Sequence, residues 1–192
     1  MGLRWVGIVL LLAASLVGCH KGEESASHAA PPGATVLSPE ERLRDRMRAG
    51  SVQISGILED LQDALALAKT IRAEIPADRP LRSPLNDVIE ALDGAGEALG
   101  DYATETPPIE EFTERFAQLD DRRLNAIDAA NDARQRIRSA FGVLDGLPDG
   151  TVEDDPNRIQ QLAEMLEVMI ADLEDAIFAL GGRVEQVDDE GS

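Results

Sequence analysis

The sequence predicts an all-α fold, an antiparallel up-down-up-down four-helix bundle that follows a cleaved signal peptide and a disordered tether. Three observations support this prediction. Apolar residues recur at alternating spacings of four and three in four separate segments, which places them along one face of a helix. Each segment begins with Ser, Thr or Asp followed by Pro, a pair typical of helix N-termini. Aromatic residues make up only 3% of the chain, and most of its apolar content comes from Leu, Ala, Ile and Val.

The first predicted helix begins at Ser38, where Pro39 takes the first helical position and Glu41 completes a capping box. Pro76 ends it. Its inward positions are apolar or small: Leu43, Met47, Gly50, Ile54, Ile57, Leu61, Ala64, Ala68, Ile71 and Ile75. Gly50 is the weak point, because glycine in a helix interior costs about 1 kcal/mol relative to alanine. The sequence leaves open whether the helix continues through Gly50 or breaks there.

The three remaining helices follow at the other start signals. The second begins at Ser83-Pro84, the third at Thr106-Pro107-Pro108 and the fourth at Asp155-Pro156. Gly146 ends the third and Gly181-Gly182 ends the fourth, because glycine readily adopts the conformation that follows a helix C-terminus. Short connections favour antiparallel neighbours. The apolar seams are wider than two positions per heptad, which favours a globular bundle over a two-stranded coiled coil.

The N-terminal residues have the composition of a secretory signal peptide. Arg4 supplies a positive charge, and residues 6–17 form an apolar run. This run is shorter than the roughly 20 residues that a membrane-spanning helix needs. It ends in Leu16-Val17-Gly18-Cys19, and Cys19 is the only cysteine of the chain. No intramolecular disulfide can form, so the fold depends on packing.

The segment Leu16-Val17-Gly18-Cys19 resembles the lipobox of bacterial lipoproteins. The resemblance implies that the Cys19 thiol receives a diacylglyceryl group, that the leader is cut between Gly18 and Cys19, and that the new α-amine is acylated. Several acyl chains anchor a protein stably, whereas one holds it only marginally. The alternative is a free or buried cysteine behind an uncleaved hydrophobic anchor. His20 rather than Asp follows the cysteine, which favours the outer membrane over the inner one in a host with two membranes.

The sequence thus predicts a division of the chain into four parts. These are a cleaved signal peptide (1–18), the lipidated Cys19 with a flexible tether (19–37), the helical bundle domain (38–182) and an acidic disordered tail (183–192). The tether lacks apolar periodicity and is rich in Ala, Ser, Gly and Pro, so burial cannot offset its ordering entropy. Both histidines, His20 and His28, lie in it and are interpreted as solvated spacers.

The composition argues against several classes of function. The formal net charge of −19 repels nucleic acid. No histidine lies in the predicted helices, and Cys19 is assigned to the anchor, so neither a Ser-His-Asp nor a Cys-His set can assemble. The chain also lacks a P-loop motif, an H-E-x-x-H motif and a Cys-x-x-Cys motif. We therefore expect neither an enzyme nor a bound cofactor.

Basic residues gather at the start of the first helix, at Arg42, Arg44, Arg46 and Arg48. They are candidates for contact with anionic lipid headgroups. Near a membrane surface, each basic side chain gains about 1 kcal/mol of binding free energy from this attraction. The alternative is a solvated first turn tied by ion pairs of Glu40 with Arg44 and of Asp45 with Arg48. The sequence favours the alternative.

Arg123 occupies a seam position of the third helix among apolar neighbours. It is a candidate for binding an anionic ligand or a partner carboxylate. More often such an arginine reaches the bundle edge or pairs with an acid on the helix surface.

Acidic residues crowd the last loop, at Asp149, Glu153, Asp154 and Asp155. They are weak candidates for a cation site, because the EF-hand spacing is missing and acids also complement a helix start.

The layout predicts a membrane-anchored lipoprotein of the bacterial cell envelope that acts as a non-catalytic binding, adaptor or structural module. Its expected partners are the lipid bilayer, through acylated Cys19, and another envelope component. A polar line on the third helix is either the solvated side or a docking surface: Asp121, Asn125, Asp128, Asp132, Gln135 and Ser139. The alternative function is a periplasmic carrier of a small ligand or cation that uses the bundle interior or the acidic loop.

Overall fold

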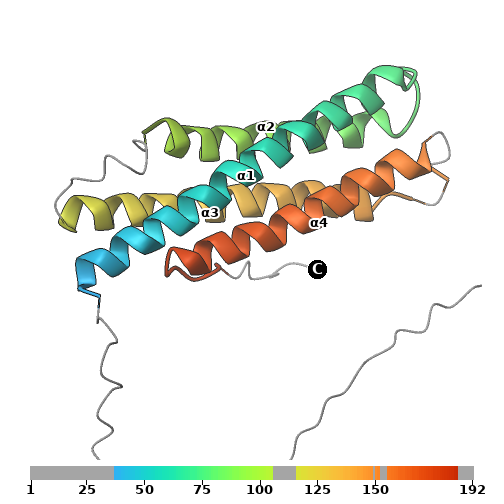
Figure 1. Ribbon diagram of the computed structural model, residues 1–192. Helices are drawn as coiled ribbons and strands as arrows, with labels where there is room; N and C mark the ends of the chain where they lie inside the picture. Colours follow the sequence, from blue (N-terminus) through green and yellow to red (C-terminus); the bar gives the residue numbers. More distant parts are fainter. Residues whose placement is uncertain (1–36, 106–115, 149, 152–154, 186–192) are drawn as a thin grey trace, which may run out of the picture. The chain divides into compact units, whose positions relative to one another are not determined.

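The computed structural model describes residues 37–105, 116–148, 150–151 and 155–185. Within them it contains four α-helices and no strand, which confirms the predicted all-α class. The helices are α1 (Pro39–Glu74), α2 (Arg82–Glu105), α3 (Phe116–Asp145) and α4 (Pro156–Ala179) (Figure 1). The chain divides into two units, Met1–Val36 and Leu37–Ser192, and every described residue belongs to the second. The predicted signal peptide, with Gly18, Cys19 and most of the tether, lies outside the described residues.

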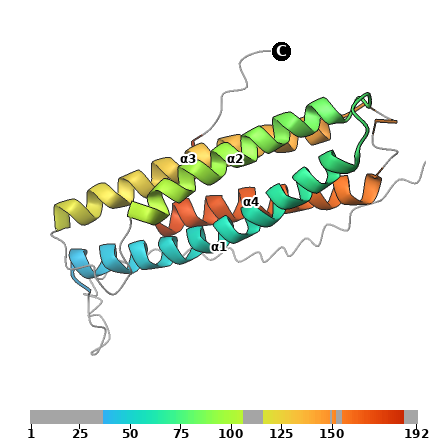
Figure 2. The same ribbon diagram turned by 90° about the horizontal axis from the view of Figure 1, so that it is seen from above.

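Each helix packs along two neighbours. α1 contacts α2 and α4, and α3 contacts the same two helices from the opposite side. Successive helices run in opposite directions, as Figures 1 and 2 both show. Ser51, in the first half of α1, shares a hydrogen bond of 3.0 Å with Tyr102 near the end of α2. Arg158, near the start of α4, pairs with Glu74 at the end of α1.

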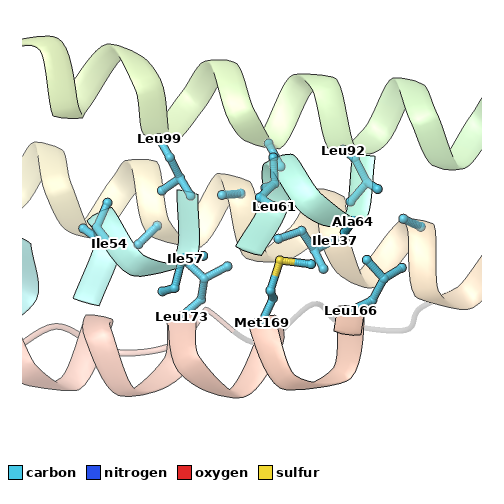
Figure 3. Close-up of a cluster of buried hydrophobic side chains, with 14 of the residues drawn as sticks. Ile54, Ile57, Leu61, Ala64, Leu92, Leu99, Ile137, Leu166, Met169 and Leu173 are labelled. Atoms are coloured by element: carbon cyan, nitrogen blue, oxygen red, sulfur yellow. The ribbon is translucent and has the colours of Figure 1, made fainter. Parts of the chain in front are cut away.

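The predicted apolar stripes form one continuous core. All ten inward positions predicted for the first helix are buried, and α2, α3 and α4 contribute further buried apolar side chains to the same core. Figure 3 shows side chains from all four helices meeting in the middle of the bundle, among them Leu61, Leu99, Ile137 and Met169. Burial of such side chains contributes about 1.5–3 kcal/mol each, so the core rather than any disulfide holds the fold.

The structure answers the question about Gly50, because α1 continues through it without a break. Gly50 is buried against Leu180, the residue that follows the last residue of α4. A Cβ at position 50 would lie 2.5 Å from both Cγ and Cδ2 of Leu180. The missing side chain therefore lets α1 approach the end of α4 closely, and this packing offsets the low helix propensity of glycine.

We predict that Gly50→Ala lowers the free energy of unfolding by about 1–2 kcal/mol, because overpacking against Leu180 outweighs the gain in helix propensity. Gly56 is the matched control on the same helix: it is exposed, and nothing lies within 4 Å of a Cβ built there. Gly56→Ala should raise the free energy of unfolding by about 1 kcal/mol. Urea denaturation followed by circular dichroism measures both changes. Equal stabilisation by the two substitutions would contradict the proposed packing.

One helix boundary differs from the predicted one, and another lies outside the described residues. α2 begins at Arg82, one residue before the predicted start, and the fully buried Leu81 precedes it. Arg82 Nη1 donates to the carbonyl oxygen of Ile75 at 2.6 Å, which ties the new helix to the end of the preceding one. The predicted start of the third helix at Thr106-Pro107-Pro108 lies outside the described residues, and α3 is described from Phe116.

The segment after α4 also differs from its prediction, because residues 183–185 were assigned to a disordered tail. Glu185 N–H donates to Asn131 Oδ1 at 3.2 Å, and Asn131 Nδ2 donates to the Arg183 carbonyl at 3.4 Å. Val184 packs against the core. Arg134, also on α3, donates from Nη1 to the Glu185 carbonyl at 3.1 Å. We call residues 183–185 the C-terminal strap, since Asn131 and Arg134 bind it to α3.

Arg134 has a second partner on α4. Its Nε and Nη2 donate to Glu174 Oε1 at 2.8 and 2.7 Å. Only 3% of Arg134 is exposed, so these hydrogen bonds compensate for the hydration that the guanidinium loses on burial. Arg134 thus joins α3, α4 and the C-terminal strap.

Candidate functional site

Two groups of arginines that the sequence analysis treated separately lie in one cleft. The cleft has a volume of about 370 Å³ and lies where the first turns of α1 and α3 meet the end of α4. Its lining residues are Pro39, Arg42, Leu43, Arg46, Asp120, Arg123 and Gly181. We call it the arginine cleft. It holds three guanidinium groups and one carboxylate, so its net charge is positive on a strongly acidic chain.

Arg123 is the most buried of the three arginines, with 16% of its side chain exposed. Its Nε donates to Asp120 Oδ1 at 2.8 Å, and its Nη1 donates to the Leu180 carbonyl at 3.2 Å. The second bond satisfies a carbonyl at the end of α4, where the helix dipole favours a cation. The pairing with a surface acid agrees with the alternative interpretation of Arg123. These two bonds use two of the five N–H groups of the guanidinium.

Arg44 and Arg48 do not line the cleft, because each pairs with an acid on its own helix. Arg44 Nη2 lies 2.7 Å from Glu40 Oε1, and Arg48 Nη1 lies 3.1 Å from Asp45 Oδ1. Both ion pairs are the ones that the spacing predicts. Exposed pairs of this kind contribute only a few tenths of a kcal/mol.

Arg42 and Arg46 are exposed and lie one helical turn apart on α1. In the described part of the chain, neither side chain forms an ion pair or a hydrogen bond. The nearby carboxylate of Glu41 serves the helix start instead, because it accepts the Ser38 N–H at 2.7 Å. This backbone hydrogen bond lowers the pKa of Glu41 below its ordinary value. Arg42 and Arg46 are therefore left without a neutralising acid in the part of the chain that the structure describes.

Gly181 brings Arg46 close to the end of α4. A Cβ at position 181 would lie 2.9 Å from Arg46 Nη1, and the φ angle of Gly181 is 78°, a conformation that favours glycine. The glycine that ends α4 thus also forms a wall of the arginine cleft. The sequence analysis identified this glycine only as a helix stop.

The acidic loop does not form a described cation site. Asp149, Glu153 and Asp154 lie outside the described residues. The Asp155 side chain caps α4 by accepting the Arg158 N–H and also pairs with the Arg158 guanidinium. Among the residues with described positions, no group of three His, Cys, Asp or Glu side chains could hold a metal ion.

A second groove lies between α1 and α4 and has a volume of about 270 Å³. It is lined by Asp60, Gln161, Glu164, Met165, Val168 and Met169. Val168 is 58% exposed, and Met165 is partly buried. We call this surface the α1–α4 groove. It combines an apolar floor with acidic side chains at its rim.

The polar line of α3 faces solvent, because all six of its residues are exposed. Two of its members are bonded within the chain: Asp132 pairs with Arg136, and Gln135 donates to the Glu185 carboxylate at 3.4 Å. This surface offers polar and acidic groups only.

No helix in the described ranges is both long enough and apolar enough to cross a membrane. Comparisons of the chain with protein-family models, curated proteins and solved structures found no match.

Proposed function

We propose that this chain is a lipid-anchored, non-catalytic binding module of the bacterial cell envelope. The anchor is supported by the leader and by the lipobox-like segment Leu16-Val17-Gly18-Cys19. His20 at the following position favours the periplasmic face of the outer membrane in a host with two membranes. The proposed anchor, the tether and a packed bundle together fit a protein that presents a helix surface to another envelope component.

The observation that carries the binding role is the α1–α4 groove. An apolar side chain that is 58% exposed at Val168 gains free energy when a partner covers it, and Met165 beside it adapts its shape to different contacts. The polar line of α3 offers no comparable apolar contact. We therefore place the partner surface on the α1–α4 groove.

The alternative function, a carrier with a ligand inside the bundle, needs interior polar groups that are free to bind. The buried polar residues of the described bundle are Asn131 and Arg134. Both are hydrogen-bonded to the chain's own C-terminal strap. The packing thus favours the binding module over the interior carrier.

A photo-crosslinking residue placed at Val168 tests this surface in intact cells. We expect a discrete adduct from position 168 and none from Ser139, the matched exposed position on the polar line. Val168→Asp, combined with a crosslinker at Gln161, should abolish the adduct and shift the melting temperature by less than about 2 °C, because position 168 is exposed. Adducts from Ser139 alone, or none from either position, would contradict the assignment.

A further inference from the structure

The arginine cleft carries positive charge that the fold leaves uncompensated. Arg42 and Arg46 are like charges four residues apart on a helix, an arrangement that destabilises the helix. Arg123 adds a third guanidinium to the same cleft, and the single carboxylate, Asp120, is already bonded to Arg123. The chain has a net charge of −19 and therefore many carboxylates that could form ion pairs. In the described part of the chain, none of them pairs with Arg42 or Arg46. An anion bound between the arginines would relieve their repulsion.

The cleft is also partly organised before any ligand binds. Arg123 is held by Asp120 and by the Leu180 carbonyl, so its free N–H groups have a fixed position. Gly181 lines the cleft next to the Arg46 guanidinium, and it has no side chain that would fill the space there. Leu43 is buried and supplies an apolar surface within the lining. A ligand therefore has to order only the two exposed side chains, Arg42 and Arg46.

The chemistry of the lining identifies the class of ligand. Guanidinium groups bind phosphate through pairs of parallel N–H···O bonds, and they stay charged at every physiological pH. Three of them surround a volume of about 370 Å³, which suits a single phosphate group with a small substituent. We infer that the arginine cleft binds a phosphate group, either that of a lipid headgroup or that of a free phosphate.

The position of the cleft beside the predicted tether indicates which of the two phosphate sources is nearer. Pro39 lines the cleft and is the first residue of α1, two residues beyond the end of the predicted tether, so a headgroup is the nearer source if the chain is anchored. Only this choice of source rests on the proposed function. Binding of phosphate itself depends on the cleft alone. Failure of the cleft would therefore leave acylation of Cys19 and crosslinking at Val168 unaffected.

Isothermal titration calorimetry on the full chain in a neutral maltoside detergent tests the inference at constant ionic strength. One arm titrates inorganic phosphate, and the other titrates short-chain dihexanoylphosphatidylglycerol. We expect saturable binding that Arg42→Gln with Arg46→Gln weakens about tenfold per arginine, because each loses a charge-assisted hydrogen bond. Tighter binding of the phosphatidylglycerol identifies a headgroup site. Equal or tighter binding of inorganic phosphate identifies a free-phosphate site.

Arg44→Gln with Arg48→Gln is the matched control. It removes the same charge from the same turns of α1, but neither residue lines the cleft. Glutamine preserves helix propensity at all four exposed or half-exposed positions, and circular dichroism checks that the fold is retained. We expect the control to keep binding within about twofold of the unmodified chain. No saturable binding in either arm, or equal weakening by both double variants, would overturn the proposed site.

Discussion

Replacing Arg134 with alanine should lower the free energy of unfolding by about 3 kcal/mol, because it breaks a buried charged network. Arg134 is 3% exposed and bonds to Glu174 on α4 and to the Glu185 carbonyl of the C-terminal strap. Alanine leaves both acceptors without their donor and leaves a cavity between α3 and α4. The strap should also lose protection against amide hydrogen exchange, since only the bonds of Asn131 and of the exposed Gln135 then tie it to α3.

Two matched changes separate the network from general effects of charge. Glu174 is 37% exposed, so Glu174→Gln should cost only about 1 kcal/mol because water replaces part of the lost bond. Arg138 lies one turn further along α3 and is exposed, and Arg138→Ala should change stability by less than about 0.5 kcal/mol. Urea denaturation of the three variants provides the comparison. If Arg134→Ala and Arg138→Ala lose the same stability, Arg134 does not hold the strap.

Replacing Cys19 with serine should abolish the proposed acylation, because a hydroxyl cannot form the thioether that the lipid anchor needs. Incorporation of labelled fatty acid should fall to background. The leader should stay attached, because the proposed cut between Gly18 and Cys19 depends on the lipidated cysteine. The chain then runs about 2 kDa heavier on a gel, the approximate mass of the 18 leader residues.

His20→Ser is the control for Cys19→Ser. It alters the neighbouring residue and leaves the segment Leu16-Val17-Gly18-Cys19 intact, so labelling and cutting should both continue. Unchanged cutting at the Gly18–Cys19 bond in the Cys19→Ser variant would show that an ordinary signal peptidase acts there and that no lipid is attached.

The helices and the core could be predicted from the sequence because both depend on local periodicity. The helical spacing of Ile54, Ile57 and Leu61 predicts that these residues are buried. The capping box of Ser38 and Glu41 predicts where the helix begins. Continuity at Gly50 could not be predicted, because it depends on Leu180, which is distant in the sequence but packs against Gly50 in the bundle. The low helix propensity of glycine depends on that residue alone, whereas the packing that offsets it involves a residue distant in the sequence.

The arginine cleft was predictable only in its separate parts. The sequence identified Arg42 and Arg46 as one candidate and Arg123 as another. Their meeting depends on which helix ends lie together in the bundle, and helical periodicity carries no such information. The ion pairs of Arg44 and Arg48 follow from i, i+4 and i, i+3 spacing and were therefore predictable.

The C-terminal strap could not be predicted, because three residues outside any helix have no apolar periodicity. A signal existed on α3, where Asn131 and Arg134 lie three residues apart, directly beside the apolar positions Ala130 and Ala133. Two polar residues at the edge of a seam, on one helix face, indicate that some segment covers them. Neither was considered in the sequence analysis.

The mass of the N-terminal tryptic peptide of the mature protein tests the proposed anchor most directly. Trypsin cuts after Lys21, so the account predicts the peptide Cys19-His20-Lys21 carrying a diacylglyceryl group on sulfur and an acyl group on its α-amine. The same peptide without any lipid, or a mature chain that still contains its leader residues, would contradict it.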